Sequence, residues 1–225
     1  MNHDSKRSIT AMKNIISVIV SLLLCLAGSA SAQEHFLEII KAEQNQKSIA
    51  RGETIPGMMV NEDKDVKVGR KLNVGDRVFV PKDVRVTFES SNRNTIKPET
   101  ISNAEFIVSN ITNKGEAYYQ LFGKIRYSVI PKAVEFFNVY HAKYLAAVEG
   151  TVFVINVDLE NKEIECTAEQ GRIRFSYKYY LVGASPIPAQ EHVDILYVWQ
   201  GKKGTVKYKL DDYDSEIIEN SEILH

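Results

Sequence analysis

The chain has 225 residues, of which 44% are apolar and 25% are charged, the composition of an ordinary globular protein. This length fits one domain with a small appendage. The formal net charge of −1 excludes a global basic field that would hold nucleic acid or an anionic membrane, and it gives acidic substrates no electrostatic steering.

The first 32 residues have the pattern of a secretory signal peptide. Lys6 and Arg7 supply positive charge, and a thirteen-residue apolar run follows from Ile15 to Ala27. Ala30-Ser31-Ala32 then provides a small-residue cleavage site. A transmembrane helix needs about 20 apolar residues, so we expect cleavage near Gln33, with retention as a membrane anchor as the alternative. This leader predicts a bacterial periplasmic or secreted protein.

Cysteine usage follows from that cleavage. Loss of Cys25 leaves Cys166 as the only cysteine, so we expect no intrachain disulfide. Cys166 alternates with Ile164, which predicts a buried inert thiol rather than a reactive one. Stability must then come from packing, for which a mature chain of about 190 residues is long enough.

Beyond the leader, the period of β-strands dominates the sequence. Residues 35–46 fit either a first strand or a short helix. Val84, Val86 and Phe88 alternate with polar residues, which predicts a half-buried strand. The polar stretch from Ser90 to Thr100 predicts a loop or an irregular edge.

Two more strand regions lie on either side of the turn Asn113-Lys114-Gly115. The residues from Ala104 to Ile111 form the first. The residues from Tyr118 to Val129 are apolar and aromatic, and Gly123 interrupts them, so a pair of strands is expected there.

The segment from Phe137 to Phe175 has the clearest pattern. Val152 to Val157 is apolar on both faces, as in a strand buried from two sides. Asp158 to Glu163 predicts the turn of a hairpin, and its return strand turns Ile164, Cys166 and Ala168 inward.

The C-terminal part begins after a break with two prolines, Gly183 to Pro188. We expect a β domain over 33–180, and over 181–225 a C-terminal hairpin and an acidic tail that docks as a helix or frays. The hairpin is predicted between Val193–Trp199 and Thr205–Leu210. Short strands recurring at intervals of about 8 to 12 residues predict an all-β fold. The candidates are an antiparallel β-sandwich or jelly-roll-like fold and a β-solenoid-like fold.

No catalytic or metal-binding motif is complete. Gly183 to Ile187 lacks the second glycine of a nucleophile elbow, and Gly201 to Thr205 has phosphate-loop letters at the wrong spacing. The histidines are far apart, and the acidic run from Asp211 to Glu216 lacks the glycine and bidentate glutamate of a calcium loop. We therefore expect a protein that is not an enzyme and has no cofactor and no metal. A dispersed pair of carboxylates is the enzymatic alternative.

Aromatic residues offer a second functional signal, because they cluster in the middle of the chain. Tyr118, Tyr119 and Tyr140 are candidates for an exposed platform that binds a glycan or a peptide. Positions in the core and at its rim are the alternative for the same residues.

Five segments of the sequence form a recognisable pattern: Ala50-Arg51-Gly52, Leu72 to Val78, Phe137-Asn138-Val139, Ala147 to Ile155 and Glu169 to Ile173. Together they resemble the FecR domain of bacterial cell-envelope proteins, and the likeness covers about residues 38 to 178. The resemblance implies a structural motif that consists of Gly75, Asp76, Gly150, Thr151, Phe153 and Gly171. Gly150 permits a backbone geometry or close approach that a side chain would block, and Gly171 supplies a turn before the next strand.

The family resemblance implies a non-catalytic module of envelope signalling or binding, with no catalytic residues to carry over. FecR-type regulators place an anti-sigma segment and a membrane span before the sensor, whereas only fourteen residues precede the apolar run here. We therefore expect a stand-alone periplasmic or secreted module with a protein partner. The alternative is a carbohydrate- or peptidoglycan-binding module. Nucleic acid is not expected, and membrane contact is expected only through an uncleaved signal.

Overall fold

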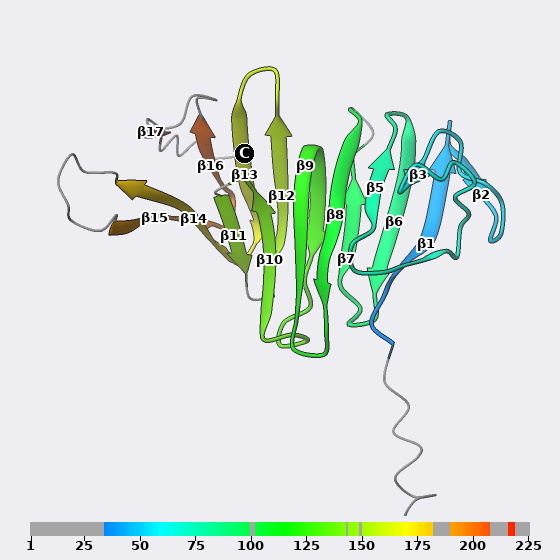
Figure 1. The fold of residues 1–225 in the computed structure, drawn as a ribbon, viewed down its shortest axis with the longest axis horizontal. Helices are drawn as coiled ribbons and strands as arrows, with labels where there is room; N and C mark the ends of the chain where they lie inside the picture. The colour runs from blue at the N-terminus through cyan, green and yellow to red at the C-terminus, as the bar shows by residue number, and fades with distance from the viewer. Residues whose placement is uncertain are drawn as a thin grey trace, which may run out of the picture. The chain divides into compact units, whose positions relative to one another are not determined.

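The computed structural model describes residues 34–99, 102–142, 144–148, 150–181, 190–207 and 216–218. These residues contain seventeen strands joined by turns and loops (Figure 1), which confirms the all-β prediction. None of the segments so described is a helix long and apolar enough to cross a membrane. The predicted signal peptide lies outside the described residues.

The first of two sheets is antiparallel throughout. It runs from β1 through β6, β7, β9, β12, β13 and β16 to β17, and β2 and β4 also pair with β1. Its strands are β1 (Leu37–Gln44), β2 (Lys47–Ile49), β4 (Lys71–Leu72), β6 (Val84–Ser90), β7 (Thr95–Pro98), β9 (Gly115–Ser128), β12 (Val152–Asp158), β13 (Glu163–Gln170), β16 (Lys202–Lys207) and β17 (Glu216–Ile218).

The second sheet runs in the order β3, β5, β8, β9, β10, β11, β14, β15. The pairing of β9 with β10 is parallel and the other pairings are antiparallel, so this sheet is mixed. Its further strands are β3 (Met59–Val60), β5 (Arg77–Val80), β8 (Ala104–Ile111), β10 (Phe136–His141), β11 (Tyr144–Val148), β14 (Arg172–Leu181) and β15 (Gln190–Trp199).

Strand β9 belongs to both sheets and changes from one to the other at Gly123. Its first part pairs with β8 and β10, and its last part pairs with β7 and β12. Gly123 has φ +86°, and a Cβ there would lie 2.3 Å from the carbonyl oxygen of Asn103. The predicted pair of strands is therefore wrong, because glycine lets one strand bend between layers instead of ending it.

A buried amide stabilises this change of sheet. Gln120 Nε2 donates hydrogen bonds to the carbonyl oxygens of Gly123, at 2.7 Å, and Ile155, at 3.1 Å. The hydroxyl of Tyr127 donates to Gln120 Oε1 at 3.0 Å. These bonds satisfy polar groups that would otherwise be costly inside the core.

The two sheets face each other across an aromatic core. Phe88 of the first sheet meets Phe106 of the second edge to face, with 5.4 Å between ring centroids. Phe137 and Phe153 make the same type of contact at 6.2 Å, and all four side chains are fully buried. Facing layers with aromatic contacts between them are the arrangement of a sandwich, which was one of the two predicted architectures.

The elements near the N-terminus resolve one ambiguity and correct one prediction. Residues 35–46 contain strand β1 rather than a helix. The expected loop from Ser90 to Thr100 contains β7, which lies between β6 and β9. Only Ile96 and Pro98 of this strand are buried, so its apolar alternation is too short to be recognised in the sequence.

The predicted hairpin of β12 and β13 is confirmed, with Ile155 opposite Cys166. Cys166 is fully buried, as expected, and burial raises the pKa of its thiol. The predicted C-terminal hairpin is wrong, because β15 pairs with β14 and β16 pairs with β13. The amide of Gly201 donates to the carbonyl oxygen of Ala168 at 2.8 Å, and this bond connects the turn to the first sheet.

Candidate functional site

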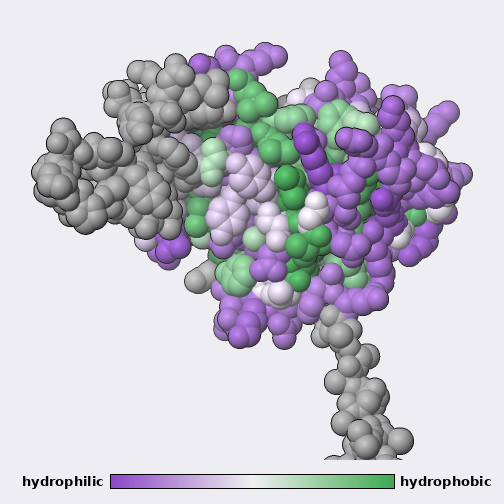
Figure 2. Space-filling view, viewed as in Figure 1, coloured by the Kyte–Doolittle hydropathy of each residue, from purple (hydrophilic) through white to green (hydrophobic). Residues whose placement is uncertain are grey.

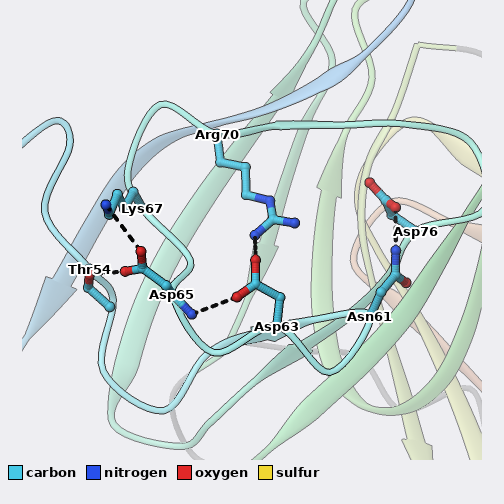
Figure 3. A network of polar contacts seen from close by, with 7 residues as sticks. All are labelled: Thr54, Asn61, Asp63, Asp65, Lys67, Arg70 and Asp76. Atoms are coloured by element: carbon cyan, nitrogen blue, oxygen red, sulfur yellow. Dashed lines mark hydrogen bonds and ion pairs between the residues drawn. The ribbon is translucent and has the colours of Figure 1, made fainter.

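The Gly75-Asp76 step of the proposed motif closes a turn before β5. Asp76 accepts a hydrogen bond from Asn61 Nδ2 at 2.6 Å (Figure 3). It also accepts one from the backbone amide of Asn73 at 2.8 Å. Gly75 has φ +96°, in the left-handed region that favours glycine. Both residues shape the backbone here, and the Asp76 carboxylate is engaged within the loop.

The neighbouring carboxylates in Figure 3 are engaged as well. Asp63 accepts from Arg70 Nη1 at 2.6 Å and from the amide of Asp65 at 2.9 Å, and the latter bond is the main cause of its lowered pKa. Asp65 accepts from Thr54 Oγ1 at 2.6 Å and forms an ion pair with Lys67 at 3.1 Å. This network stabilises an irregular exposed segment, and its local partners already use the donors and acceptors that a ligand would need.

The C-terminal part of the proposed motif lies at one end of the sandwich. Gly150 has φ +60°, and a Cβ there would lie 2.6 Å from Cα of Pro131. Gly171 has φ +76°, and Thr151 Oγ1 would be 3.0 Å from its Cβ. Phe153 is fully buried and stacks on Tyr127 at 5.1 Å. These positions belong to the scaffold.

The expected tyrosine platform needs correction at Tyr118. This side chain is fully buried, and its hydroxyl donates to Glu116 Oε2 at 2.7 Å. Burial, with the nearby Glu116 carboxylate, raises the pKa of Tyr118 well above its usual range. Strand alternation is the physical reason, because consecutive residues of β9 point to opposite faces of the sheet.

Tyr119 and Tyr140 are neighbours on the outer face of the second sheet. They are register partners on β9 and β10, and both are half-buried. The Tyr119 hydroxyl accepts from the amide of Ala142 at 2.8 Å, and the Tyr140 hydroxyl accepts from Asn138 Nδ2 at 3.2 Å. Figure 2 shows apolar and weakly polar residues gathered over β8 to β10, whereas the surface over β1 to β6 is mainly hydrophilic.

A groove of about 560 Å³ follows on the same sheet, across β10, β11, β14 and β15. In the register of these strands, the small side chain of Ala147 lies between Asn138 on β10 and Arg174 on β14, where it leaves room for the groove. The residues that line the groove are Glu135, Phe136, Phe137, Asn138, Leu145, Ala147, Val148, Arg172, Arg174 and Tyr197.

One side of the groove is a cross-strand ladder of two arginines and two aromatic residues, which we call the Arg–aromatic ladder. Arg172 lies opposite Trp199, and Arg174 lies opposite Tyr197. The Arg172 guanidinium lies over the rings of Tyr197 and Trp199, at 5.1 and 5.2 Å from their centroids. Trp199 is 57% exposed and Tyr197 is 46% exposed. No described carboxylate forms an ion pair with either arginine.

This ladder was not predicted from the sequence. Its signal is an alternation on two strands, in which two arginines separated by Ile173 face two aromatic residues separated by Val198. The expectation that β15 pairs with β16 hid this match, because the facing strand was assigned to the wrong neighbour.

A second depression, of about 410 Å³, lies on the first sheet and has a different electrostatic character. Its lining includes Lys41, Glu43 and Arg126, which form short ion pairs: Lys41 with Glu43 at 2.6 Å and Arg126 with Glu169 at 2.7 Å. Arg85 and Lys97 also line this depression and form no ion pair among the described residues, so its cations are only partly neutralised. Within the described ranges, no group of three or more His, Cys, Asp or Glu residues is placed to hold a metal ion.

No protein-family model matches the sequence, and no curated protein matches it. Two crystal structures of a "putative anti-sigma factor" from Parabacteroides distasonis ATCC 8503 are similar in structure, each with 12% sequence identity and a TM-score of 0.44. The similarity covers 67% of this chain and 58% of each of theirs, so this chain spans less than two thirds of the length of those chains.

Proposed function

We propose that this protein is a non-catalytic binding module that holds a protein partner in the groove of the second sheet. The observation that carries the proposal is the Arg–aromatic ladder, in which exposed Trp199 and Tyr197 flank Arg172 beside the groove. Tryptophan, tyrosine and arginine are the residue types that most often dominate the binding energy of protein interfaces.

The ladder is also organised before any partner arrives. Strand pairing sets the positions of Arg172 and Trp199, and stacking restrains the long arginine side chain over two rings. A side chain that is ordered in advance loses less conformational entropy on binding. The groove therefore offers a restrained hot spot beside a concave surface.

The proposed setting is the bacterial periplasm or the outside of the cell. Its support is the signal-like pattern of residues 1–32, with charge, an apolar run and a small-residue site in the expected order. We place the module in envelope signalling or protein interaction on this basis and on the sequence strings that resemble the FecR domain.

Comparative capture from envelope extracts tests the proposal. The wild-type protein and the variants Trp199→Ala and Arg85→Ala are immobilised at equal density, and the retained proteins are identified. Arg85 is an exposed arginine on the first sheet and serves as the matched surface control. We expect the same partner with wild type and Arg85→Ala, and its loss with Trp199→Ala. Capture of the same partner by Trp199→Ala at the wild-type level would contradict the proposal.

A cell-wall glycan is the second candidate, because the exposed rings of Tyr197 and Trp199 are of the type that stacks on sugars. Arg172 already covers one face of each ring, which favours the protein partner. Co-sedimentation with purified peptidoglycan separates the two. Retention that is lost in Trp199→Ala and preserved in Arg85→Ala would favour the glycan.

A further inference from the structure

We infer that the groove binds an extended acidic peptide in which two carboxylates are separated by one residue, one carboxylate pairing with Arg172 and the other with Arg174. This inference rests on the proposed function and adds the chemistry of the partner. Its basis is the positive charge of the groove and the spacing of Arg172 and Arg174 on β14.

The charge of the groove is complementary to an acidic peptide. Arg172 and Arg174 are both exposed, line the groove, and have no carboxylate partner among the described residues. The acidic residue in the described lining is Glu135, which precedes β10. Two guanidinium groups against one carboxylate leave a local excess of positive charge in a protein whose net charge is −1.

The guanidinium group of arginine is well suited to bind a carboxylate. A guanidinium presents N–H donors in a planar fork that matches the two oxygens of a carboxylate, and such bidentate pairs are both stronger and more directional than neutral hydrogen bonds. Stacking of Arg172 on Tyr197 and Trp199 holds the guanidinium plane while the edge stays available for hydrogen bonds.

The spacing of the two arginines matches that of side chains on an extended peptide. Arg172 and Arg174 are two residues apart on one strand and point to the same face, about 6.6 Å apart along the strand. An extended peptide repeats its side chains on one face at the same interval. Two acidic residues separated by one residue therefore match both arginines, whereas two adjacent acidic residues point to opposite sides.

The first sheet differs in how its cations are held. Lys41, Lys124 and Arg126 each form an ion pair with a neighbouring glutamate at 3.1 Å or less, whereas Arg85 and Lys97 have neither an ion pair nor an aromatic contact among the described residues. In the groove, two arginines without a described carboxylate partner lie two residues apart on one strand, and Arg172 is held over two rings. Exposed pairs are screened by salt, so binding in the groove should weaken as ionic strength rises.

The test measures fluorescence anisotropy of three labelled peptides with the full-length mature protein. One peptide contains Glu-Ser-Glu between apolar flanks, the second replaces both glutamates with glutamine, and the third has Glu-Glu-Ser with the same composition. We expect the first to bind at least about tenfold more tightly than either of the others. Equal affinity for the first and third peptides would overturn the inferred spacing of the two carboxylates. Equal affinity for the first and second peptides would overturn the inferred requirement for negative charge.

Variants locate the site. Arg172→Gln and Arg174→Gln should each weaken binding of the first peptide about tenfold, whereas Arg85→Gln should leave it unchanged, with circular dichroism confirming the fold of each. An equal loss in Arg85→Gln would overturn the assignment to the groove.

A competition experiment separates failure of this inference from failure of the proposed function. The captured partner is displaced with an excess of the Glu-Ser-Glu peptide. Displacement supports both. If capture of the partner requires Trp199 but the peptide does not displace the partner, the proposed function is supported and the inferred acidic ligand is contradicted. If capture does not require Trp199, both the proposed function and the inferred ligand are contradicted.

Discussion

Strand β9 and the Arg–aromatic ladder both contain charged and aromatic side chains, but in opposite environments. In β9, Glu116 is fully buried, and its carboxylate accepts hydrogen bonds from Ser90 at 2.6 Å, Asn94 at 2.8 Å and Tyr118 at 2.7 Å. In the ladder, Arg172 is exposed and its guanidinium lies over two aromatic rings.

The difference separates stability from recognition. A buried carboxylate is tolerated only when donors replace the water it has lost, so the neighbours of Glu116 cannot be changed independently of the fold. An exposed arginine has no such requirement, and changing it should affect a partner more than the protein itself. Four measurements can break or sharpen this contrast.

The largest effect is expected at the bend of β9. In Gly123→Ala, the new Cβ would lie 2.3 Å from a backbone oxygen at a residue with φ +86°, so strain and overpacking add. We expect a loss of about 4 kcal/mol in the free energy of unfolding, measured by urea denaturation, or failure to fold.

The matched control is Gly201→Ala, next to the ladder, where φ is +72° and nothing lies within 4 Å of the new Cβ. Only backbone strain acts there, so about 1 kcal/mol is expected. Similar losses in the two variants would show that the bend of β9 is no more constrained than the turn beside the ladder.

The second effect concerns the buried carboxylate. Glu116→Ala removes the acceptor of Ser90, Asn94 and Tyr118 and leaves buried donors unsatisfied. We expect a loss of about 3 kcal/mol in urea unfolding. A variant as stable as wild type would mean that the network does not stabilise β9.

The third effect is a small one at the ladder. Trp199→Ala removes an exposed ring and its contact with Arg172, so the free energy of unfolding should fall by about 0.5 kcal/mol while partner binding is lost. Urea denaturation and capture are measured on the same sample. Destabilisation as large as that of Glu116→Ala would place Trp199 in the fold rather than in the binding surface.

The smallest effect is a pH dependence at His141, at the end of β10. Burial lowers its pKa below the ordinary value of 6.5, so protonation is easier in the unfolded chain. Stability from this group is present above pH 6.5 and is lost as the pH falls through the lower folded-state pKa.

Urea unfolding between pH 8 and pH 5 measures that dependence. We expect His141→Gln to have a shallower decline than wild type and Arg172→Ala to have the same decline as wild type. Identical curves for His141→Gln and wild type would show that His141 is not the source of the pH dependence.

Much of the fold was predictable because its signals are local. The hairpin of β12 and β13 follows from an apolar run and an alternating return strand on the two sides of a polar turn, and burial of Cys166 follows from that alternation. Strand β7 was missed because its alternation covers two buried residues, Ile96 and Pro98.

The candidate site was less predictable. Tyr118, Tyr119 and Tyr140 were predicted as an exposed platform, but Tyr118 is fully buried and the other two are half-buried. The period of a strand reveals which residues share a face and not which face is inside. The sequence offered no reason to select Arg172 and Arg174, because their aromatic neighbours lie on β15, and the pairing of β14 with β15 was not predicted.

Composition, alternation and turn residues by themselves determined the all-β class, the hairpin of β12 and β13 and the buried thiol of Cys166. Only the tertiary structure decided that β9 joins two sheets and that β15 and β16 pair with different neighbours. The physical reason is that strand pairing depends on hydrogen bonds between residues distant in sequence, such as that between Gly201 and Ala168. Those pairings place Arg172 and Arg174 opposite Trp199 and Tyr197.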